Sequence, residues 1–155
     1  MILSSLLGLL LVAQAAPGSA LERFFIGRTE GSGTVHVIMS GRHSVRDRGR
    51  GRMDGRTLVI EQVVEEEGKP ARRRSWRLTR SGSNAVTGTI SDARGPVTGQ
   101  VSGNSLTLRY RMNEGPSVVQ TITLQPGGRT ARNRMSFRRY GLNVATVETT
   151  IRRVD

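Results

Sequence analysis

The sequence predicts an all-β fold, an antiparallel up-and-down barrel of about nine or ten strands with one short N-terminal helix. After Gly27, apolar and polar residues alternate with a period of two in one segment after another, as in half-buried strands. Glycine accounts for 19 of the 155 residues, and turn signals such as Asp54-Gly55 separate the segments. Since no helical segment separates them, we expect hairpin connections, and closing the meander into a barrel would remove its free edges.

The N-terminal segment 2–16 has the composition of a signal peptide. It carries no charge, consists mostly of Leu, Val and Ala, and places Ala13 and Ala15 in an A-x-A cleavage pattern. We therefore predict a signal peptide at 1–15, a single domain at 16–155, and a periplasmic or secreted protein of the bacterial cell envelope. The apolar run is shorter than the ~20 residues of a membrane span. Because no Lys or Arg precedes it, retention as a short anchor is an alternative to cleavage.

A short helix is predicted at 20–26. Ser19 followed three residues later by Glu22 fits a capping box, and Gly27 ends the run. Apolar residues recur at helical spacing at Leu21, Phe24 and Phe25. Because two of the three phenylalanines lie in this segment, we expect the helix to plug or cap the core.

The strands follow from the two-residue alternation. In the segment 105–113, Leu106, Leu108 and Tyr110 alternate with hydroxyl or charged residues, so one face is apolar. The same pattern predicts strands near 29–39, 42–53, 56–66, 71–80, 85–92, 96–102, 105–113, 117–124, 130–140 and 142–153.

Composition narrows the classes of partner and chemistry. The chain has 24 Lys and Arg against 12 Asp and Glu, a formal net charge of +12, and Lys69 is its only lysine. A positive field favours anionic partners such as lipid headgroups or acidic polymers, whereas export makes nucleic acid an unexpected partner. The absence of cysteine excludes disulfides, thiolate metal sites, cysteine nucleophiles and a lipoprotein anchor.

Four arginines occupy alternate positions of the predicted strand 42–53, so they share one face. They are Arg46, Arg48, Arg50 and Arg52. We interpret this face as solvated. The alternative is an anion-binding surface, which would make the protein a structural or interaction module of the envelope that contacts anionic lipid or polymer.

Other polar residues fall in phase with core residues. Arg72 and Arg74 alternate in phase with Trp76, so the strand would aim them inward. Buried arginine costs free energy unless it is paired, so either these groups lie at the barrel mouth or they line a cavity. A largely apolar cavity with an arginine suits a fatty acid or other anionic amphiphile. The candidate ligand-binding residues are Arg72, Arg74, Trp76, Gln62, Tyr110 and Gln120.

No catalytic motif is present: the chain lacks G-x-S-x-G, H-E-x-x-H, a P-loop and a complete dinucleotide loop. We predict no cofactor and no metal site, and interpret His36 and His43 as surface residues of a hairpin. We expect a binding protein more than an enzyme. An enzyme would need Tyr110 and Arg74 to share a pocket with a carboxylate such as Glu61.

The order of several short motifs resembles an uncharacterised bacterial family, domain of unknown function 3833. The motifs are Leu21-Glu22-Arg23-Phe24-Phe25-Ile26-Gly27 with Gly33, Met53-Asp54-Gly55, Arg74-Ser75-Trp76-Arg77-Leu78, Gly99 to Leu106, Asn133-Arg134 and Tyr140-Gly141. The resemblance implies a lipocalin-like barrel, export and a link to lipids, with no established activity. The family's Asp-Asp-Trp-Met segment is replaced here at 121–126, and Arg139 stands in place of its lysine. We therefore expect an exported lipocalin-like protein that binds a lipid or other anionic amphiphile.

Overall fold

The computed structural model describes residues 19–155. The predicted signal peptide at 1–15 lies outside the described residues. Within the described range, no helix is long and apolar enough to cross a bilayer.

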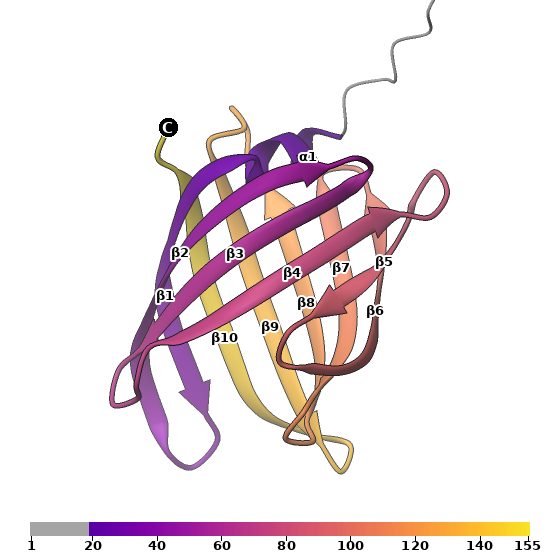
Figure 1. Ribbon diagram of the computed structural model, residues 1–155. Coiled ribbons are helices and arrows are strands. Elements are labelled where there is room, and N and C mark those ends of the chain that lie inside the picture. Colours follow the sequence, from indigo (N-terminus) through magenta and orange to yellow (C-terminus); the bar gives the residue numbers. More distant parts are fainter. Residues whose placement is uncertain (1–18) are drawn as a thin grey trace, which may run out of the picture.

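The fold is a closed antiparallel barrel of ten strands with one short helix, which confirms the predicted fold class (Figure 1). The strands are β1 (Gly27–Val37), β2 (Gly41–Asp54), β3 (Thr57–Glu66), β4 (Arg72–Arg80), β5 (Ala85–Ile90), β6 (Ala93–Ser102), β7 (Ser105–Met112), β8 (Ser117–Leu124), β9 (Thr130–Arg139) and β10 (Leu142–Arg153). Each strand pairs with its neighbour in sequence, and β1 closes the barrel by pairing with β10, from Thr29 opposite Arg153 to Val37 opposite Ala145. The sheet therefore has no free edge.

One strand begins earlier than predicted. β6 starts at Ala93, whereas the alternation indicated a start near position 96. The pairing of β6 with β7 shifts register between Arg94 and Thr98, where Gly95 has a φ of +73°. A bulge at this point accommodates Pro96, which has no N–H to donate, and lets the strand continue on both sides of it.

The alternation of inward and outward residues builds the core. In β8, Val118, Gln120, Ile122 and Leu124 are buried while the residues between them are partly exposed. Apolar residues form a large cluster around Trp76 and Leu108 and a small one of Val35, Val45 and Val64. A layer of polar side chains lies inside the same barrel.

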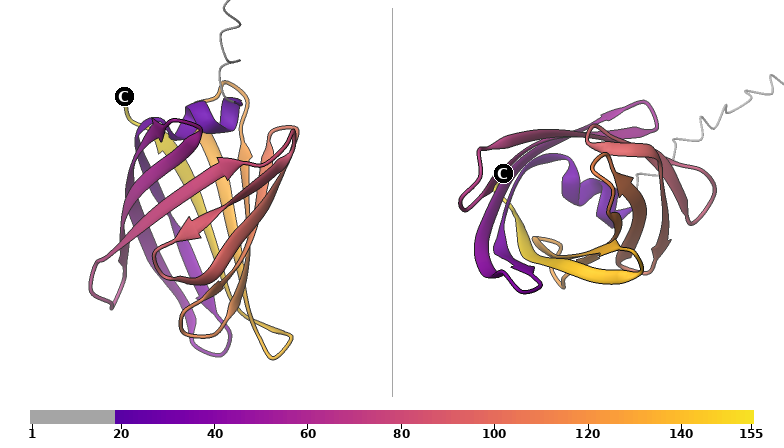
Figure 2. Two further views of the ribbon diagram at one scale, coloured as in Figure 1. Left: turned by 45° about the vertical axis from the view of Figure 1, so that its right-hand side comes forward. Right: turned by 90° about the horizontal axis from the view of Figure 1, so that it is seen from below.

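Helix α1 (Ala20–Phe25) covers one end of the barrel, as predicted (Figure 2). The Ser19 hydroxyl accepts a hydrogen bond from the Glu22 N–H at 3.3 Å, which caps the helix. Leu21 and Phe24 are buried in the large cluster. Glycine on β2 makes room for this packing, because a Cβ on Gly51 would lie 1.8 Å from the Phe25 carbonyl oxygen.

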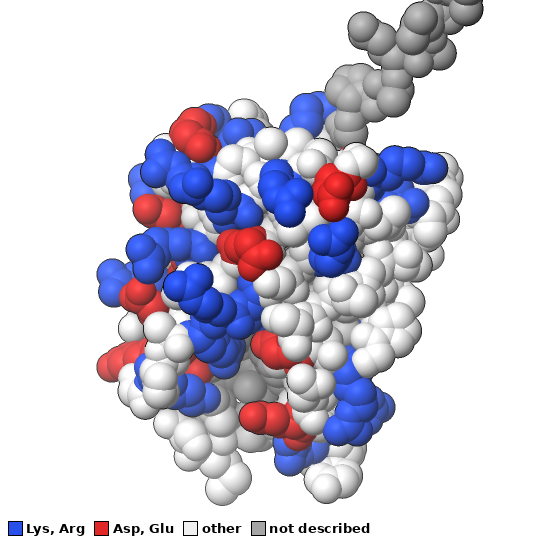
Figure 3. All heavy atoms as spheres, viewed as in Figure 1, with Lys and Arg blue, Asp and Glu red and all other residues white. Residues whose placement is uncertain are grey.

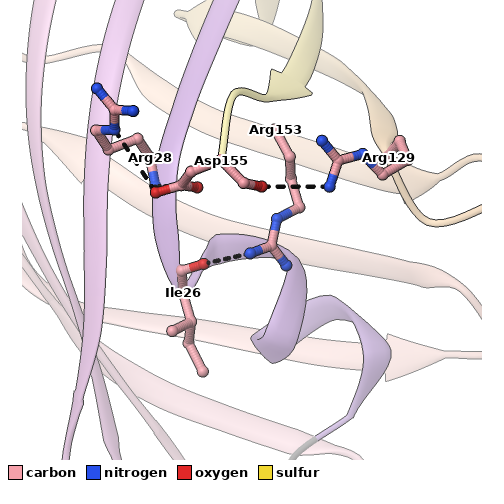
Figure 4. A network of polar contacts seen from close by, with 5 residues as sticks. All are labelled: Ile26, Arg28, Arg129, Arg153 and Asp155. Atoms are coloured by element: carbon pink, nitrogen blue, oxygen red, sulfur yellow. Dashed lines mark hydrogen bonds and ion pairs between the residues drawn. The ribbon is translucent and has the colours of Figure 1, made fainter.

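The C-terminal end of α1 is tied to the seam between β1 and β10 (Figure 4). The Arg153 guanidinium donates to the carbonyls of Arg23 and Ile26, both at 2.9 Å. The Asp155 carboxylate accepts from the N–H of Arg28 at 3.0 Å, and the pKa of this carboxyl lies below its usual range because of that bond. These contacts join α1, β1 and β10 in one polar cluster.

The outer surface is strongly basic. The side chains of Arg46, Arg48, Arg50 and Arg52 are all exposed on β2, while Val45, Gly49 and Gly51 between them are buried. Figure 3 shows the face that β2, β3 and β4 form, and on this face Lys and Arg side chains predominate over Asp and Glu. Glu65 on β3 pairs with Arg46 and Arg48, at 3.5 Å in each case.

Candidate ligand-binding site in the barrel interior

A cavity of about 100 Å³ lies inside the barrel and reaches the end that α1 covers. Its walls toward α1 are mainly aliphatic: Leu58, Ile60, Leu78, Leu106, Ile122 and Ile151. Its deeper part is polar, with Asp47, Gln62, Arg74, Gln120, Asn133 and Thr149. The interior is therefore amphipathic, with one apolar and one polar region.

A hydrogen-bonded row crosses four strands on the polar side. The Tyr110 hydroxyl on β7 donates to Gln120 Oε1 on β8 at 2.8 Å, and Gln120 Nε2 donates to Asn133 Oδ1 on β9 at 2.8 Å. Asn133 Nδ2 then donates to Thr149 Oγ1 on β10 at 3.1 Å. Each amide both accepts and donates, so its orientation is set by its neighbours.

A second row crosses β4, β3 and β2. The Trp76 indole N–H donates to Gln62 Oε1 at 2.9 Å, and Gln62 Nε2 donates to Asp47 Oδ2 at 2.8 Å. Trp76 also contacts Tyr110 edge to face, with ring centroids 6.0 Å apart. This contact joins the two rows, so one polar layer spans seven of the ten strands.

Asp47 is a carboxyl group held in the barrel wall. Burial raises its pKa, an effect that the Gln62 hydrogen bond and the Arg74 charge partly offset. The facing position on β1 is Gly31, where a Cβ would lie 1.9 Å from Asp47 Oδ1. Glycine at this position therefore leaves the carboxylate the space that it occupies.

Arg74 is the central feature of the site. Its side chain is 4% exposed, its Nε lies 2.8 Å from Asp92 Oδ2, and its guanidinium carbon lies 4.8 Å from the centre of the Trp76 ring. Its Nη2 is buried and makes no well-aligned hydrogen bond within residues 19–155, although the Tyr110 hydroxyl lies close enough to interact with the guanidinium. A buried cationic donor without an acceptor is costly, so the cavity offers a place for an oxygen acceptor at this atom.

The rim of the cavity lies beside α1. Glu22 of the helix and Arg80 of β4 both line it, and Arg80 Nε lies 2.7 Å from Glu22 Oε1. Phe25, on the same helix, is half-buried and also lines the cavity. The helix and this ion pair thus form the boundary between the cavity and solvent.

Five of the six predicted ligand-binding residues lie in the barrel interior. Trp76, Gln62, Arg74, Tyr110 and Gln120 form the polar layer described above. The sixth, Arg72, is exposed and does not line the cavity. It is the first residue of β4, two residues beyond the buried Arg74, so it lies at the end of the strand, as in the alternative of a position at the barrel mouth.

Asp47, Asn133 and Thr149 also line the cavity but were not predicted from the sequence. Asp47 stands between two arginines of the basic segment, and its odd position alone indicated that it faces inward. Asn133 lies between the buried Ala131 and Met135, so the same parity rule identifies it. A polar residue at a position whose alternation points inward was the signal in the sequence that could have identified these residues.

The acidic partner suggested for an enzyme is not in this site. Glu61 is exposed on the outer face of β3, where its carboxylate accepts from the Ser75 hydroxyl at 2.5 Å. The carboxylate in the interior is Asp47. The part of the chain that the structure describes contains no group of three His, Cys, Asp or Glu side chains that could hold a metal ion. His36 is exposed, whereas His43 is half-buried with its Nε2 3.2 Å from Glu66 Oε1.

Comparisons with known proteins agree with this architecture. A family model described as "Protein of unknown function (DUF3833)" matches residues 8–153. No curated protein matches the chain. Among solved structures, the S-type phycobiliprotein lyase CPES from Guillardia theta superposes with a TM-score of 0.69 at 8% identity, over 87% of this chain and 91% of the lyase chain. At this identity the similarity shows a shared lipocalin-like fold alone.

Proposed function

The chain belongs to the family of unknown function DUF3833, and we propose that its barrel binds a small anionic amphiphile whose charged group lies at Arg74. In this proposal the apolar part of the ligand lies against the aliphatic wall toward α1. The protein would work as an exported binding protein, in accordance with the signal peptide that the sequence predicts. An amphipathic interior supports a ligand with one charged end and one apolar end.

The observation that carries the proposal is the unpaired Nη2 of Arg74. Asp92 neutralises part of the arginine charge and Trp76 covers one face of the guanidinium, yet Nη2 makes no well-aligned hydrogen bond in residues 19–155, and the Tyr110 hydroxyl beside the guanidinium is an uncharged group that donates to Gln120. A carboxylate, sulfate or phosphate oxygen would supply an acceptor through a charge-assisted hydrogen bond. The neighbouring amides of Gln62 and Gln120 offer further polar contacts on the same side of the cavity.

The size of the cavity restricts the ligand. At about 100 Å³ it is smaller than the ~300–1,000 Å³ of ordinary ligand pockets. A short alkyl chain therefore fits with little change, whereas a long chain requires displacement of lining side chains such as Phe25 or Met135. We expect affinity to rise with chain length only until the cavity is filled.

The test compares Arg74→Met with Arg72→Met in titrations with sodium octanoate and 1-octanol. Trp76, the only tryptophan, lies against Arg74 and reports occupancy by its fluorescence. We expect saturable octanoate binding in the wild type and in Arg72→Met. We expect roughly tenfold to hundredfold weaker binding in Arg74→Met, because a hydrogen bond to a charged group contributes about 1.5–3 kcal/mol.

Methionine matches the aliphatic part of the arginine side chain, and Asp92 is partly exposed and can be hydrated, so Arg74→Met should fold. Circular dichroism and thermal unfolding check this. Equal octanoate affinity in a folded Arg74→Met variant would refute the proposal, as would equal affinity of the wild type for octanol and octanoate.

A second candidate function rests on the basic face of β2. Arg50 and Arg52 are exposed and form no hydrogen bond or ion pair with any other described residue, so both charges are available to an anionic lipid or polymer. Exchange of the four arginines for glutamine would test it. Binding to an anionic polymer such as heparin should then lose both its strength and its salt dependence.

A further inference from the structure

Two hairpin tips at the end of the barrel opposite α1 expose large apolar side chains. Ile38 and Met39, in the β1–β2 connection, are 58% and 100% exposed, and Tyr140 and Leu142, at the β9–β10 connection, are 96% and 69% exposed. In residues 19–155 the other exposed large hydrophobic residues are Ile26 and Met53, at 37% each. Exposed apolar surface is therefore concentrated at these two tips.

The two tips are neighbours in the barrel. β1 pairs with β10, and the pairing extends into the tips, where the Ile38 N–H donates to the Val144 carbonyl at 3.0 Å. Figures 1 and 2 show that these two hairpins reach furthest from α1. The four side chains can therefore contact one surface beneath the barrel at the same time.

The backbone at both tips is unusual. Met39 and Tyr140, with φ of 65° and 53°, are the only residues other than glycine in the described chain with positive φ. This left-handed region favours glycine and asparagine, which turns of this kind normally use. Bulky apolar residues in strained positions that are also fully exposed point to a function outside folding.

The surroundings of the tips are basic. Arg42 is the second residue of β2, and Arg138 and Arg139 end β9; all three are exposed. None of them forms an ion pair with another residue of the described chain. Arg139 donates to the backbone carbonyl of Glu114, at 2.8 Å, and not to its carboxylate. Cationic side chains thus flank the apolar tips, and the exposed Glu67 and Glu114 are acidic residues at the same end of the barrel.

We propose that these two tips dock the protein on an anionic lipid bilayer. Met39, Tyr140 and their apolar neighbours would insert at the boundary between headgroups and acyl chains, where tyrosine is favoured. The three arginines would lie against lipid phosphates. Protruding tips flanked by cations suit a soft anionic surface better than a rigid protein groove. This docking is independent of the interior ligand, and it leaves the α1 end and the cavity rim facing away from the bilayer.

The test is flotation of the full-length chain with vesicles of phosphatidylcholine, with and without 30% phosphatidylglycerol. The variant Met39→Asn with Tyr140→Asn removes both apolar tips and keeps residues that tolerate positive φ, so it should fold at least as stably. We expect its partition coefficient on anionic vesicles to fall at least tenfold. Residues 2–16 are the same in every variant, so the difference reports on the tips.

Two control variants distinguish the tips from other surfaces. Met53→Asn removes an exposed apolar residue at the α1 end, and exchange of Arg46, Arg48, Arg50 and Arg52 for glutamine removes the β2 charges. Met53→Asn should retain at least half of the wild-type partition coefficient, and the β2 variant should lose clearly less of it than the tip variant does. Unchanged binding by the tip variant, or loss of binding only in the β2 variant, would overturn the proposal. The proposal would also be overturned if analytical ultracentrifugation showed a wild-type dimer that the tip variant abolishes, while binding of that variant to vesicles stayed unchanged.

Discussion

At the scale of single residues, Asp47 shows how the interior opposes the stability of the fold. Its carboxyl group is buried beside Gln62 and under the influence of Arg74, and burial raises its pKa. A carboxyl whose folded pKa is raised favours the native state most below the unfolded pKa, near 3.8. That contribution is lost as the pH rises through the folded pKa. The barrel is therefore less stable when this carboxyl group is ionised than when it is protonated.

We expect Asp47→Asn to raise the melting temperature at pH 7. Asparagine keeps an oxygen that can accept from Gln62 and removes the cost of burying a charge. The gain should shrink as the pH falls through the folded pKa of Asp47, and it should be lost below the unfolded pKa, near 3.8, where the wild-type carboxyl is protonated in both states. Asp54→Asn on the same strand is the control, because exposed pairs such as Asp54 with Arg77 contribute only about 0–1 kcal/mol. A lower melting temperature for Asp47→Asn at pH 7 would show that the carboxylate stabilises the barrel.

At the scale of elements, α1 combines two roles in two adjacent phenylalanines. Phe24 is fully buried in the core, while Phe25 is half-buried and lines the cavity, and their rings meet edge to face with centroids 5.0 Å apart. The first anchors the helix to the barrel end, and the second limits the volume open to a ligand. A six-residue helix has little stability alone, so these contacts determine whether it stays in place.

Replacing each phenylalanine should separate these roles. Phe24→Ala is expected to cost about 3–5 kcal/mol of unfolding free energy, as for a fully buried phenylalanine. Phe25→Ala should cost clearly less and should enlarge the cavity, so that dodecanoate gains affinity relative to octanoate. Urea unfolding and Trp76 fluorescence titrations measure both effects. If Phe25→Ala left the preference for chain length unchanged, Phe25 would not limit the cavity.

At the scale of the whole molecule, alternation in the sequence predicted the fold well because a barrel wall has one inside and one outside. The same rule identified Arg74, Gln62 and Gln120 as inward residues, and it does not extend to Arg72, the exposed first residue of β4. Closure of β1 on β10 depends on pairing between distant segments, which local periodicity does not encode. The unpaired donor of Arg74 and the size of the cavity depend on packed side chains, so only the structure reveals them.

The response of stability to high pH is also a property of the whole molecule. Arginine keeps its charge up to about pH 12, and the chain has one lysine, Lys69, and two tyrosines, Tyr110 and Tyr140. Lys69 and Tyr140 are exposed, whereas Tyr110 is buried and donates to Gln120. Burial raises the pKa of Tyr110, an effect that the nearby Arg74 partly offsets. The folded barrel therefore keeps the Tyr110 proton at pH values at which the unfolded chain has lost it.

We therefore expect the unfolding free energy to fall as the pH rises above about 10, since the unfolded state then binds fewer protons than the native state. The limiting slope for one group is about 1.4 kcal/mol per pH unit, and it should end where the pH passes the folded pKa of Tyr110. Tyr110→Phe starts from a lower stability, because Gln120 loses a donor, but its unfolding free energy should decline less steeply over this range. Urea unfolding of both proteins at several pH values measures the slopes. Equal slopes would mean that the alkaline response comes from the surface and not from the polar layer inside the barrel.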